Sequence, residues 1–389
     1  MQNRSAGWLV EEAMSPGQPA LPLQTRLGSY ELVRLLAQGG MADVYLARQL
    51  ATGEHRAVKV LNQACAHDAE ARAMFHDEAR LLGMLRHDHL AAVHEANSDS
   101  GVHYLAMEYV DGADLRGLLA AAERQDAAIS YEAAVSIIAA AARGLDHAHR
   151  RCSPDGQPLH LVHRDVSLSN IMVGRDGSVK VVDFGIATAT ISSHETSPGV
   201  VRGKTSYMSP EQCLGDAVDL RTDVFALGIV LYELTTRRRC FVGNSDFERM
   251  LAVVHGNYTR PTEAVEGFPV ELAAVIERAL ALDPAERFAS AAALFEALEH
   301  AAAVHGWTLG AEAITATMQA LYADATEIVA ADDTEPVLRS ARVEPTVVAI
   351  PRRFPRGTDC SAIAAADYDD EPTRGRRSAP RLGRIRHAA

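Results

Sequence analysis

Apolar and polar positions divide the chain into a strand-rich first part and a helical second part. Short apolar runs, several with alternating polar positions, predict strands at 30–36, 44–47, 57–61 and 104–110. Apolar residues that recur every three to four positions predict helices at 70–86, 115–122, 131–150, 222–235, 270–281, 290–304 and 311–322. The change comes after about residue 110, so we predict an α+β fold in which a small sheet lobe joins a larger helical lobe at 108–114.

The two ends of the chain lack such a pattern. Residues 1–27 carry three prolines among small and polar residues, which predicts a disordered leader. Residues 324–389 are dominated by Pro, Asp and Arg without periodicity, which predicts a disordered tail. Its last part is basic, with arginines at 374, 376, 377, 381, 384 and 386. Such an end can bind an anionic surface or a regulatory partner, or remain solvated.

The composition is that of a globular protein with a large core. Of the 389 residues 48% are hydrophobic, enough for one domain at 28–300, with lobes at about 28–108 and 114–300, and for a helical extension at 301–323. The net charge of −13 argues against nucleic acid as the main partner, because phosphate binding needs a basic face. The five cysteines are scattered without a C-x-x-C pair, and no apolar run approaches the ~18 residues of a membrane span. We therefore expect a cytoplasmic protein without a transmembrane span.

The stretch 163–185 combines a predicted hairpin with polar residues at its open end. It has the sequence H-R-D-V-S-L-S-N-I-M-V-G-R-D-G-S-V-K-V-V-D-F-G, in which Asp176-Gly177 predicts a two-residue turn between the apolar runs 171–173 and 179–182. If Arg175 pairs with Ser178, Asn170 faces Asp183.

Directly opposed residues lie about 5 Å apart, close enough for an amide oxygen and a carboxylate to share one hard cation. Asp165, on the same loop as Asn170, supplies a second carboxylate that could act on a substrate. The hairpin therefore has the features of a platform for a metal ion and a base.

A lysine within an apolar strand needs a partner, because a buried ammonium group is costly unless it is paired. Lys59 lies in the apolar run 57–61, and the helix predicted next carries Glu78 three residues after Phe75, on its apolar stripe. We therefore predict an ion pair between Lys59 and Glu78.

Five motifs in this order resemble the eukaryotic-like, bacterial Hanks-type serine/threonine protein kinase family over about 30–298. They are A-V-K-V with Lys59, F-H-D-E with Glu78, H-R-D-V-S-L-S-N with Asp165 and Asn170, D-F-G with Asp183, and S-P-E with Glu211. The resemblance implies a bilobal protein-kinase fold with an antiparallel sheet and one helix in the N-lobe and a mainly helical C-lobe.

The resemblance also implies roles for these residues with ATP and Mg²⁺ as cofactors. Lys59 would hold the α- and β-phosphates while Glu78 fixes its side chain. Asn170 and Asp183 would bind Mg²⁺, and Asp165 would orient the substrate hydroxyl and accept its proton. Asp223 would brace the catalytic loop, Arg287 would pair with Glu211, and His163 is expected to be structural.

The implied nucleotide site has three parts, which would contact the phosphates, the adenine and the ribose. It comprises Leu36, Ala37, Gln38, Gly39, Gly40, Met41, Ala42, Asp43 and Val44 in the phosphate loop, Ala57 and Lys59 in the next strand, and Met107, Glu108, Val110 and Asp114 at the junction. Met107 would stand behind the adenine, the backbone of Glu108 and Val110 would bind its edge, and Asp114 would lie near the ribose.

The chain departs from the family pattern at three places. In the phosphate loop, Ala37 and Ala42 replace the first and third glycines, which reduces backbone freedom. In the catalytic loop, Ser167 replaces a lysine, while in the activation segment Lys204 replaces a threonine. We expect the two positions to face each other across Asp165, so our hypothesis is that Lys204 supplies the catalytic charge that Ser167 lacks.

The predicted function is transfer of the γ-phosphoryl group of ATP to serine or threonine of proteins, including autophosphorylation in cytoplasmic signalling. A phosphorylated hydroxyl of the activation segment could pair with Arg164. The candidates are Thr188, Thr190, Ser192, Ser193, Thr196, Ser197 and Thr205. Two alternatives stay open: a catalytically impaired pseudokinase that serves as a binding or scaffold module, and a small-molecule phosphotransferase with a related loop.

Overall fold

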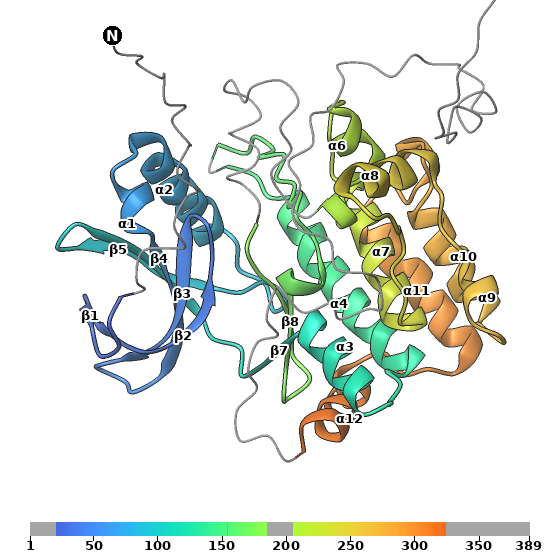
Figure 1. The fold of residues 1–389 in the computed structure, drawn as a ribbon, viewed down its shortest axis with the longest axis horizontal. Coiled ribbons are helices and arrows are strands. Elements are labelled where there is room, and N and C mark those ends of the chain that lie inside the picture. The colour runs from blue at the N-terminus through green and yellow to red at the C-terminus, as the bar shows by residue number, and fades with distance from the viewer. Residues whose placement is uncertain (1–20, 154, 185–204, 324–389) are drawn as a thin grey trace, which may run out of the picture. The chain divides into compact units, whose positions relative to one another are not determined.

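The N-lobe is a twisted antiparallel sheet with helices beside it. The computed structural model describes residues 21–153, 155–184 and 205–323. Six strands follow the order β1-β2-β3-β4-β6-β5. They are β1 (Arg26–Leu27), β2 (Tyr30–Gln38), β3 (Ala42–Gln49), β4 (His55–Leu61), β5 (Val93–Asp99) and β6 (Val102–Glu108). Helices α1 (Gln63–Ala66) and α2 (Ala69–Gly83) follow β4, as Figure 1 shows.

The ordered lobe begins earlier than predicted. Arg26 and Leu27 form β1, which pairs with β2, although they were expected to belong to the disordered leader. Leu27 is buried at 3% exposure, and the Leu21 amide donates to the Tyr45 hydroxyl at 2.6 Å. The short segment is held by these tertiary contacts, which local composition does not reveal.

Helix α2 carries the predicted glutamate on its buried face. Asp68 caps the helix by accepting a hydrogen bond from the Glu70 amide at 2.9 Å. Phe75, Glu78 and Leu82 are all buried, so the carboxylate lies on the stripe that packs against the sheet. This places Glu78 opposite β4.

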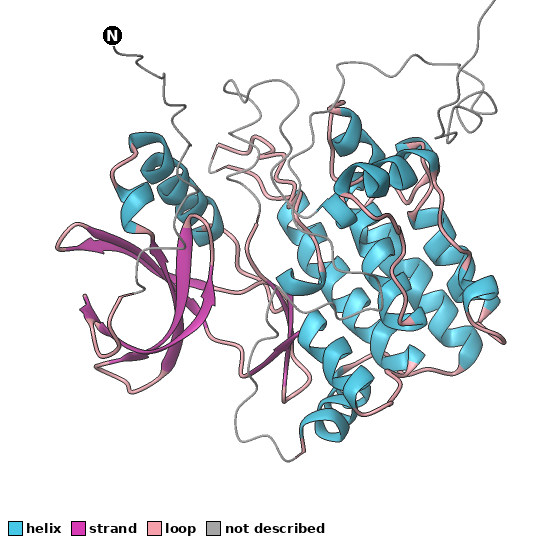
Figure 2. Ribbon diagram, viewed as in Figure 1, coloured by secondary structure: helices cyan, strands magenta, loops and turns pink. Residues whose placement is uncertain are grey.

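The C-lobe is mainly helical, and the colours of Figure 2 separate it clearly from the strands of the N-lobe. Its helices are α3 (Leu115–Arg124), α4 (Tyr131–His149), α6 (Pro210–Leu214), α7 (Arg221–Thr236), α8 (Asp246–His255), α9 (Pro261–Ala264), α10 (Val270–Ala279), α11 (Ala291–His305) and α12 (Ala311–Tyr322). Short 3₁₀ turns are η1 (Leu168–Asn170), η2 (Thr205–Tyr207) and η3 (Pro284–Glu286). Helix α7 is buried along nearly its whole length, as expected for a helix that is apolar on all sides.

A small sheet of β7 (Gly112–Asp114), β8 (Ile171–Gly174) and β9 (Val179–Val181) lies where the two lobes meet. The predicted register of its hairpin is wrong by one residue. Ile171 pairs with Val181 and Met172 with Lys180, so a three-residue loop replaces the two-residue turn. Gly177 has φ +80°, the left-handed conformation that such loops place at their last position.

The described residues were also compared with two expectations, those for the cysteines and for a membrane-spanning helix. Cys65, Cys152, Cys213 and Cys240 are free thiols. In the same parts of the chain, no helix combines the length and apolar character needed to cross a bilayer.

Candidate active site

Lys59 links the sheet to both α2 and the end of the hairpin. Its Nζ donates to Glu78 Oε1 at 2.9 Å and to Asp183 Oδ1 at 3.1 Å. Burial by itself would lower the pKa of Lys59, but the carboxylates of Asp183 and Glu78 outweigh it and hold that pKa above its usual value. The predicted pair between Lys59 and Glu78 is therefore present, and it leaves a charged ammonium facing Asp183.

The catalytic loop is anchored from below by Asp223 of α7. Its carboxylate accepts hydrogen bonds from the amides of His163 at 2.8 Å and Arg164 at 2.9 Å, and lies 2.7 Å from His149 Nε2. Burial would raise the pKa of Asp223, but these partners lower it overall, so the carboxylate stays charged. Arg164 has φ +66°, a strained conformation that this anchor compensates.

Asn170 connects the predicted base to the predicted metal site. Its Nδ2 donates to Asp165 O at 2.7 Å and to Asp165 Oδ2 at 2.9 Å, which orients both side chains. Asn170 O accepts from the Val182 amide at 3.0 Å, and Asp183 follows with φ +51°. The corrected register thus pairs Asn170 with Val182. Asp183, with its left-handed backbone conformation, is the next residue in the chain after this pair.

The oxygen donors of Asn170 and Asp183 fit a hard cation. The Asn170 amide nitrogen is engaged with Asp165, which leaves its Oδ1 for a metal ion. Within the described residues, no three side chains of His, Cys, Asp or Glu are grouped to hold a metal by themselves. A site with few protein ligands suits Mg²⁺, which keeps water or phosphate oxygens as its other ligands.

The predicted phosphate loop, 36–44, comprises the end of β2, the connection 39–41 and the start of β3. Asn62 Nδ2 donates to Gly39 O at 2.9 Å, and a Cβ on Gly39 would meet Ala42 O at 2.7 Å, so only glycine fits there. A Cβ on Gly40 would meet no atom within 4 Å. The Asp43 side chain is buried, which raises the pKa of its carboxyl. The loop thus requires glycine at position 39, whereas position 40 has space for a side chain.

The junction between the lobes contains an ion pair that the sequence analysis missed. Lys180 Nζ lies 2.8 Å from Glu108 Oε1, and the Ala92 amide donates to Glu108 Oε2 at 3.2 Å. The V-K-V pattern around Lys180 resembles the A-V-K-V pattern around Lys59 and could have revealed it. Nearby, Asp114 caps α3 by accepting from the Gly117 amide at 2.7 Å.

Comparison with known proteins identifies the family. The model of the protein kinase domain matches residues 30–301. The chain belongs to the protein kinase family. It is 39% identical over 297 residues to the tyrosine-protein kinase MasK of Myxococcus xanthus, covering 74% of this chain and 46% of MasK. It is 38% identical over 268 residues to the serine/threonine-protein kinase PknB of Mycobacterium leprae, covering 68% and 41%.

Solved structures agree with this assignment. A C20A mutant of the PknI kinase domain of Mycobacterium tuberculosis is 30% identical and superposes with a TM-score of 0.55, over 73% of this chain and all of that domain. The bilobal kinase fold predicted from the motifs is therefore confirmed. This chain spans less than half the length of MasK and PknB, so the likeness concerns their kinase domains.

The ion pair at the junction leads to a prediction about ATP binding by this kinase domain. Lys180→Met or Glu108→Gln should raise the KM for ATP by roughly 5-fold with kcat unchanged, because a partly buried pair contributes about 1 kcal/mol. The double variant should cost no more than either single one, since both remove one interaction. Steady-state kinetics measures this.

The matched control is the exposed pair of Arg48 and Glu31, in the N-lobe sheet that also contains Glu108. Arg48→Met should leave the KM for ATP unchanged. Additive effects of the two junction variants would show that Lys180 and Glu108 act independently.

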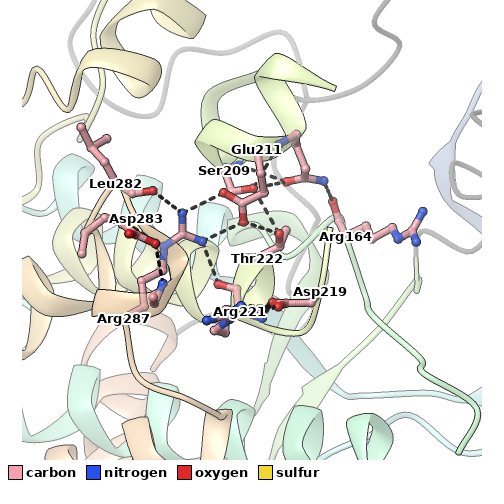
Figure 3. Close-up of polar contacts among 12 residues, drawn as sticks. Arg164, Ser209, Glu211, Asp219, Arg221, Thr222, Leu282, Asp283 and Arg287 are labelled. Atoms are coloured by element: carbon pink, nitrogen blue, oxygen red, sulfur yellow. Dashed lines mark hydrogen bonds and ion pairs between the residues drawn. The ribbon is translucent and has the colours of Figure 1, made fainter. Parts of the chain in front are cut away.

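A buried ion pair fixes the end of the activation segment in this kinase domain. The Arg287 guanidinium donates from Nη1 to Glu211 Oε1 and from Nη2 to Glu211 Oε2, both at 2.8 Å, as Figure 3 shows. Thr222 Oγ1 also donates to Glu211 at 2.6 Å. Gln212 Nε2 donates to Arg164 O at 3.0 Å, which joins this network to the catalytic loop.

Several predicted residues of the activation segment lie outside the described residues. These include Lys204 and all candidate hydroxyls except Thr205. Thr205 is buried and its Oγ1 donates to Asp246 at 2.9 Å, so it is not accessible in this conformation. Ser167 is fully buried, and its hydroxyl has no hydrogen-bond partner among the described residues.

Proposed function

We propose that this protein transfers the γ-phosphoryl group of ATP to serine or threonine hydroxyls of proteins, including its own. The observation that carries the proposal is that two sets of polar contacts meet near Asp183. Lys59 joins Glu78 to Asp183, and Asn170 joins Asp165 to the strand that leads to Asp183. A phosphate-binding cation, two oxygen ligands and a base thus come from one connected network.

In this proposal each residue has a role that the family resemblance implies and that its contacts support. Lys59, held by Glu78, is placed to bind the α- and β-phosphates. Asp165, oriented by Asn170, is placed to accept the proton of the attacking hydroxyl. Bound Mg²⁺ neutralises negative charge on the phosphates when the phosphoryl group moves. Asn170 and Asp183 would hold it through side-chain oxygen atoms.

The remaining residues position the nucleotide. The loop 36–44 lies over the phosphates in this proposal, with Gly39 and Gly40 allowing close approach of the backbone. The Val110 amide and the Glu108 backbone bind the adenine edge next to Met107 and Ala57, and Asp114 binds the ribose. The Glu108 carboxylate is fixed by Lys180, which supports a defined adenine position.

The choice of serine and threonine rests on the family resemblance and on PknB. MasK, which is named a tyrosine kinase, is as similar as PknB, so the acceptor hydroxyl needs a direct test. The complete set of Lys59, Asp165, Asn170 and Asp183 argues against a pseudokinase. The Glu211 network at the end of a long activation segment supports a protein substrate rather than a small molecule.

The test is incubation of the full chain with γ-labelled ATP and Mg²⁺, followed by mapping of the phosphorylated residues. Phosphoserine or phosphothreonine on the chain or on an added protein is the expected result. Phosphotyrosine alone would contradict the proposed acceptor. Nucleotide binding without any incorporation would favour the pseudokinase.

Ser167 stands where the family resemblance implies a lysine, and this motivates the proposed role of Lys204. A serine hydroxyl cannot supply the positive charge that a lysine would bring beside the γ-phosphate, so we propose that Lys204 supplies it. Lys204→Ala should lower kcat by about 10- to 100-fold, the low end for loss of one electrostatic contact to the transferred group. ATP affinity and thermal stability should not change.

A conservative variant provides the control for this prediction. Lys204→Arg keeps the positive charge and should retain most of the rate if the charge itself matters. An unchanged rate in Lys204→Ala, measured with normal ATP binding, would rule out the exchange. Contact of the basic tail with a regulatory partner and a cytoplasmic location remain predictions from the sequence.

A further inference from the structure

Helix α12 lies beyond the matched kinase domain, which ends at residue 301, yet it belongs to the same core. Ile314, Met318 and Leu321 are buried in the main hydrophobic cluster of the domain. The connection before it is tied to α4, because the Thr308 amide donates to Glu132 Oε1 at 2.7 Å and the Gly310 amide to Ser136 Oγ at 3.2 Å. The helix is therefore a fixed addition to the domain.

The first turn of α12 packs directly on the loop of the β8–β9 hairpin. A Cβ on Gly177 would meet Ala311 O, and it would lie 2.6 Å from Thr315 Oγ1. The helix therefore leaves no room for a side chain at this loop position. The opposite end of this hairpin carries Asn170 and leads to Asp183. Figure 1 shows α12 at the closed end of this sheet.

The last turn of α12 reaches α3 close to the proposed ribose contact. At the far end of α3, Gln125 Nε2 donates to Leu321 O at 2.8 Å, while the Tyr322 hydroxyl lies near the start of α3. A Cβ on Gly117 would lie 3.7 Å from the Tyr322 hydroxyl and 3.0 Å from Asp114 Oδ1. The Tyr322 hydroxyl and the Asp114 carboxylate thus flank the same glycine. Burial, with a contribution from Asp114, raises the pKa of Tyr322 to about 12, so the phenol stays protonated at neutral pH.

We propose that α12 is a positioning element of the nucleotide site, and that Tyr322 is a positioning residue for Asp114. The helix contacts the start of α3 with its last turn and the catalytic hairpin with its first turn. It thereby fixes the distance between the ribose contact and the metal ligands. This inference rests on the proposed function, in which Asp114 binds the ribose.

The experiment compares the dissociation constants of ATP and 2′,3′-dideoxy-ATP, measured by calorimetry with Mg²⁺ on the full chain. Tyr322→Ala should weaken ATP binding about 3- to 10-fold, the loss expected when Asp114 no longer makes its hydrogen bond to the ribose. Dideoxy-ATP lacks the ribose hydroxyls, so its binding should stay unchanged. Gln319→Ala, an exposed position on the same helix, is the matched control and should change neither constant.

A second variant tests the helix as a whole. Met318→Asp introduces a charge into the core face of α12 and should release it. Hydrogen exchange at the amides of Gly117 and Gly177 should then become faster, while exchange in α7 stays slow.

The outcomes separate this inference from the proposed function. Equal weakening of ATP and dideoxy-ATP in Tyr322→Ala would indicate general destabilisation and overturn the positioning role. The positioning role would also be overturned if the dissociation constants in Tyr322→Ala and the exchange rates of Gly117 and Gly177 in Met318→Asp were unchanged, although the amides of α12 itself exchanged freely. A folded wild-type chain that binds neither nucleotide would instead refute the proposed function, and the ribose role with it.

Discussion

Asp165→Asn is expected to lower the rate of phosphoryl transfer by about 10²- to 10⁴-fold, the usual contribution of a positioned general base. The carboxylate is oriented by Asn170 Nδ2, which donates to Asp165 Oδ2 at 2.9 Å. An amide at this position has the same shape and can still accept that hydrogen bond, but it cannot take the proton of the attacking hydroxyl. Rapid-quench measurement of a single turnover gives the rate of the chemical step.

Nucleotide affinity should stay within about 2-fold of wild type in this variant, because Asp165 is assigned to the hydroxyl and not to ATP. Asp126→Asn is a suitable control, since the Asp126 side chain is 99% exposed. It should keep the full rate. A rate in Asp165→Asn above one tenth of wild type would show that another group accepts the proton.

Arg287→Ala is expected to lower the free energy of unfolding by about 3–5 kcal/mol, because it leaves a buried carboxylate without its partner. The Arg287 side chain is 0% exposed and that of Glu211 is 8% exposed. Arg287 also donates to the carbonyl oxygens of Ala281 and Leu282 at 2.8 and 3.1 Å, and these would lose a donor as well. Urea unfolding at neutral pH measures the difference.

The nearby pair of Arg221 and Asp219 gives a matched control with the same charges. Its side chains are 31% and 50% exposed, so Arg221→Ala should cost only about 0–1 kcal/mol. Glu211→Gln should cost less than Arg287→Ala, since a neutral amide can still accept from the guanidinium. Similar losses of unfolding free energy in Arg287→Ala and Arg221→Ala would mean that burial does not increase the contribution of the pair of Arg287 and Glu211.

The pairing of Lys59 with Glu78 could be predicted because both residues lie within elements that have a clear apolar pattern. Lys59 follows from the strand at 57–61, and Glu78 from the stripe of α2. Strand β5 was missed because it lies at the edge of the sheet, where most of its side chains are exposed and the apolar alternation is lost. Lys180 was missed because its partner Glu108 comes from another strand, 72 positions earlier.

The sequence by itself determined the fold class and the position of most helices and strands, and from it we predicted the residues to which the chemistry is assigned. These depend on local periodicity and on side-chain types, which are present in the chain before it folds. Even the helix over 311–322 was predicted from its pattern.

Only the tertiary structure decided what these elements contact. The three-residue loop at Gly177 shifts the hairpin register by one, and α12 packs against that loop. The Glu211 network and the ion pair between Lys180 and Glu108 also join residues far apart in sequence. Periodicity indicates which face of an element is buried, but packing between distant elements determines its partner, since that depends on the shape of both surfaces.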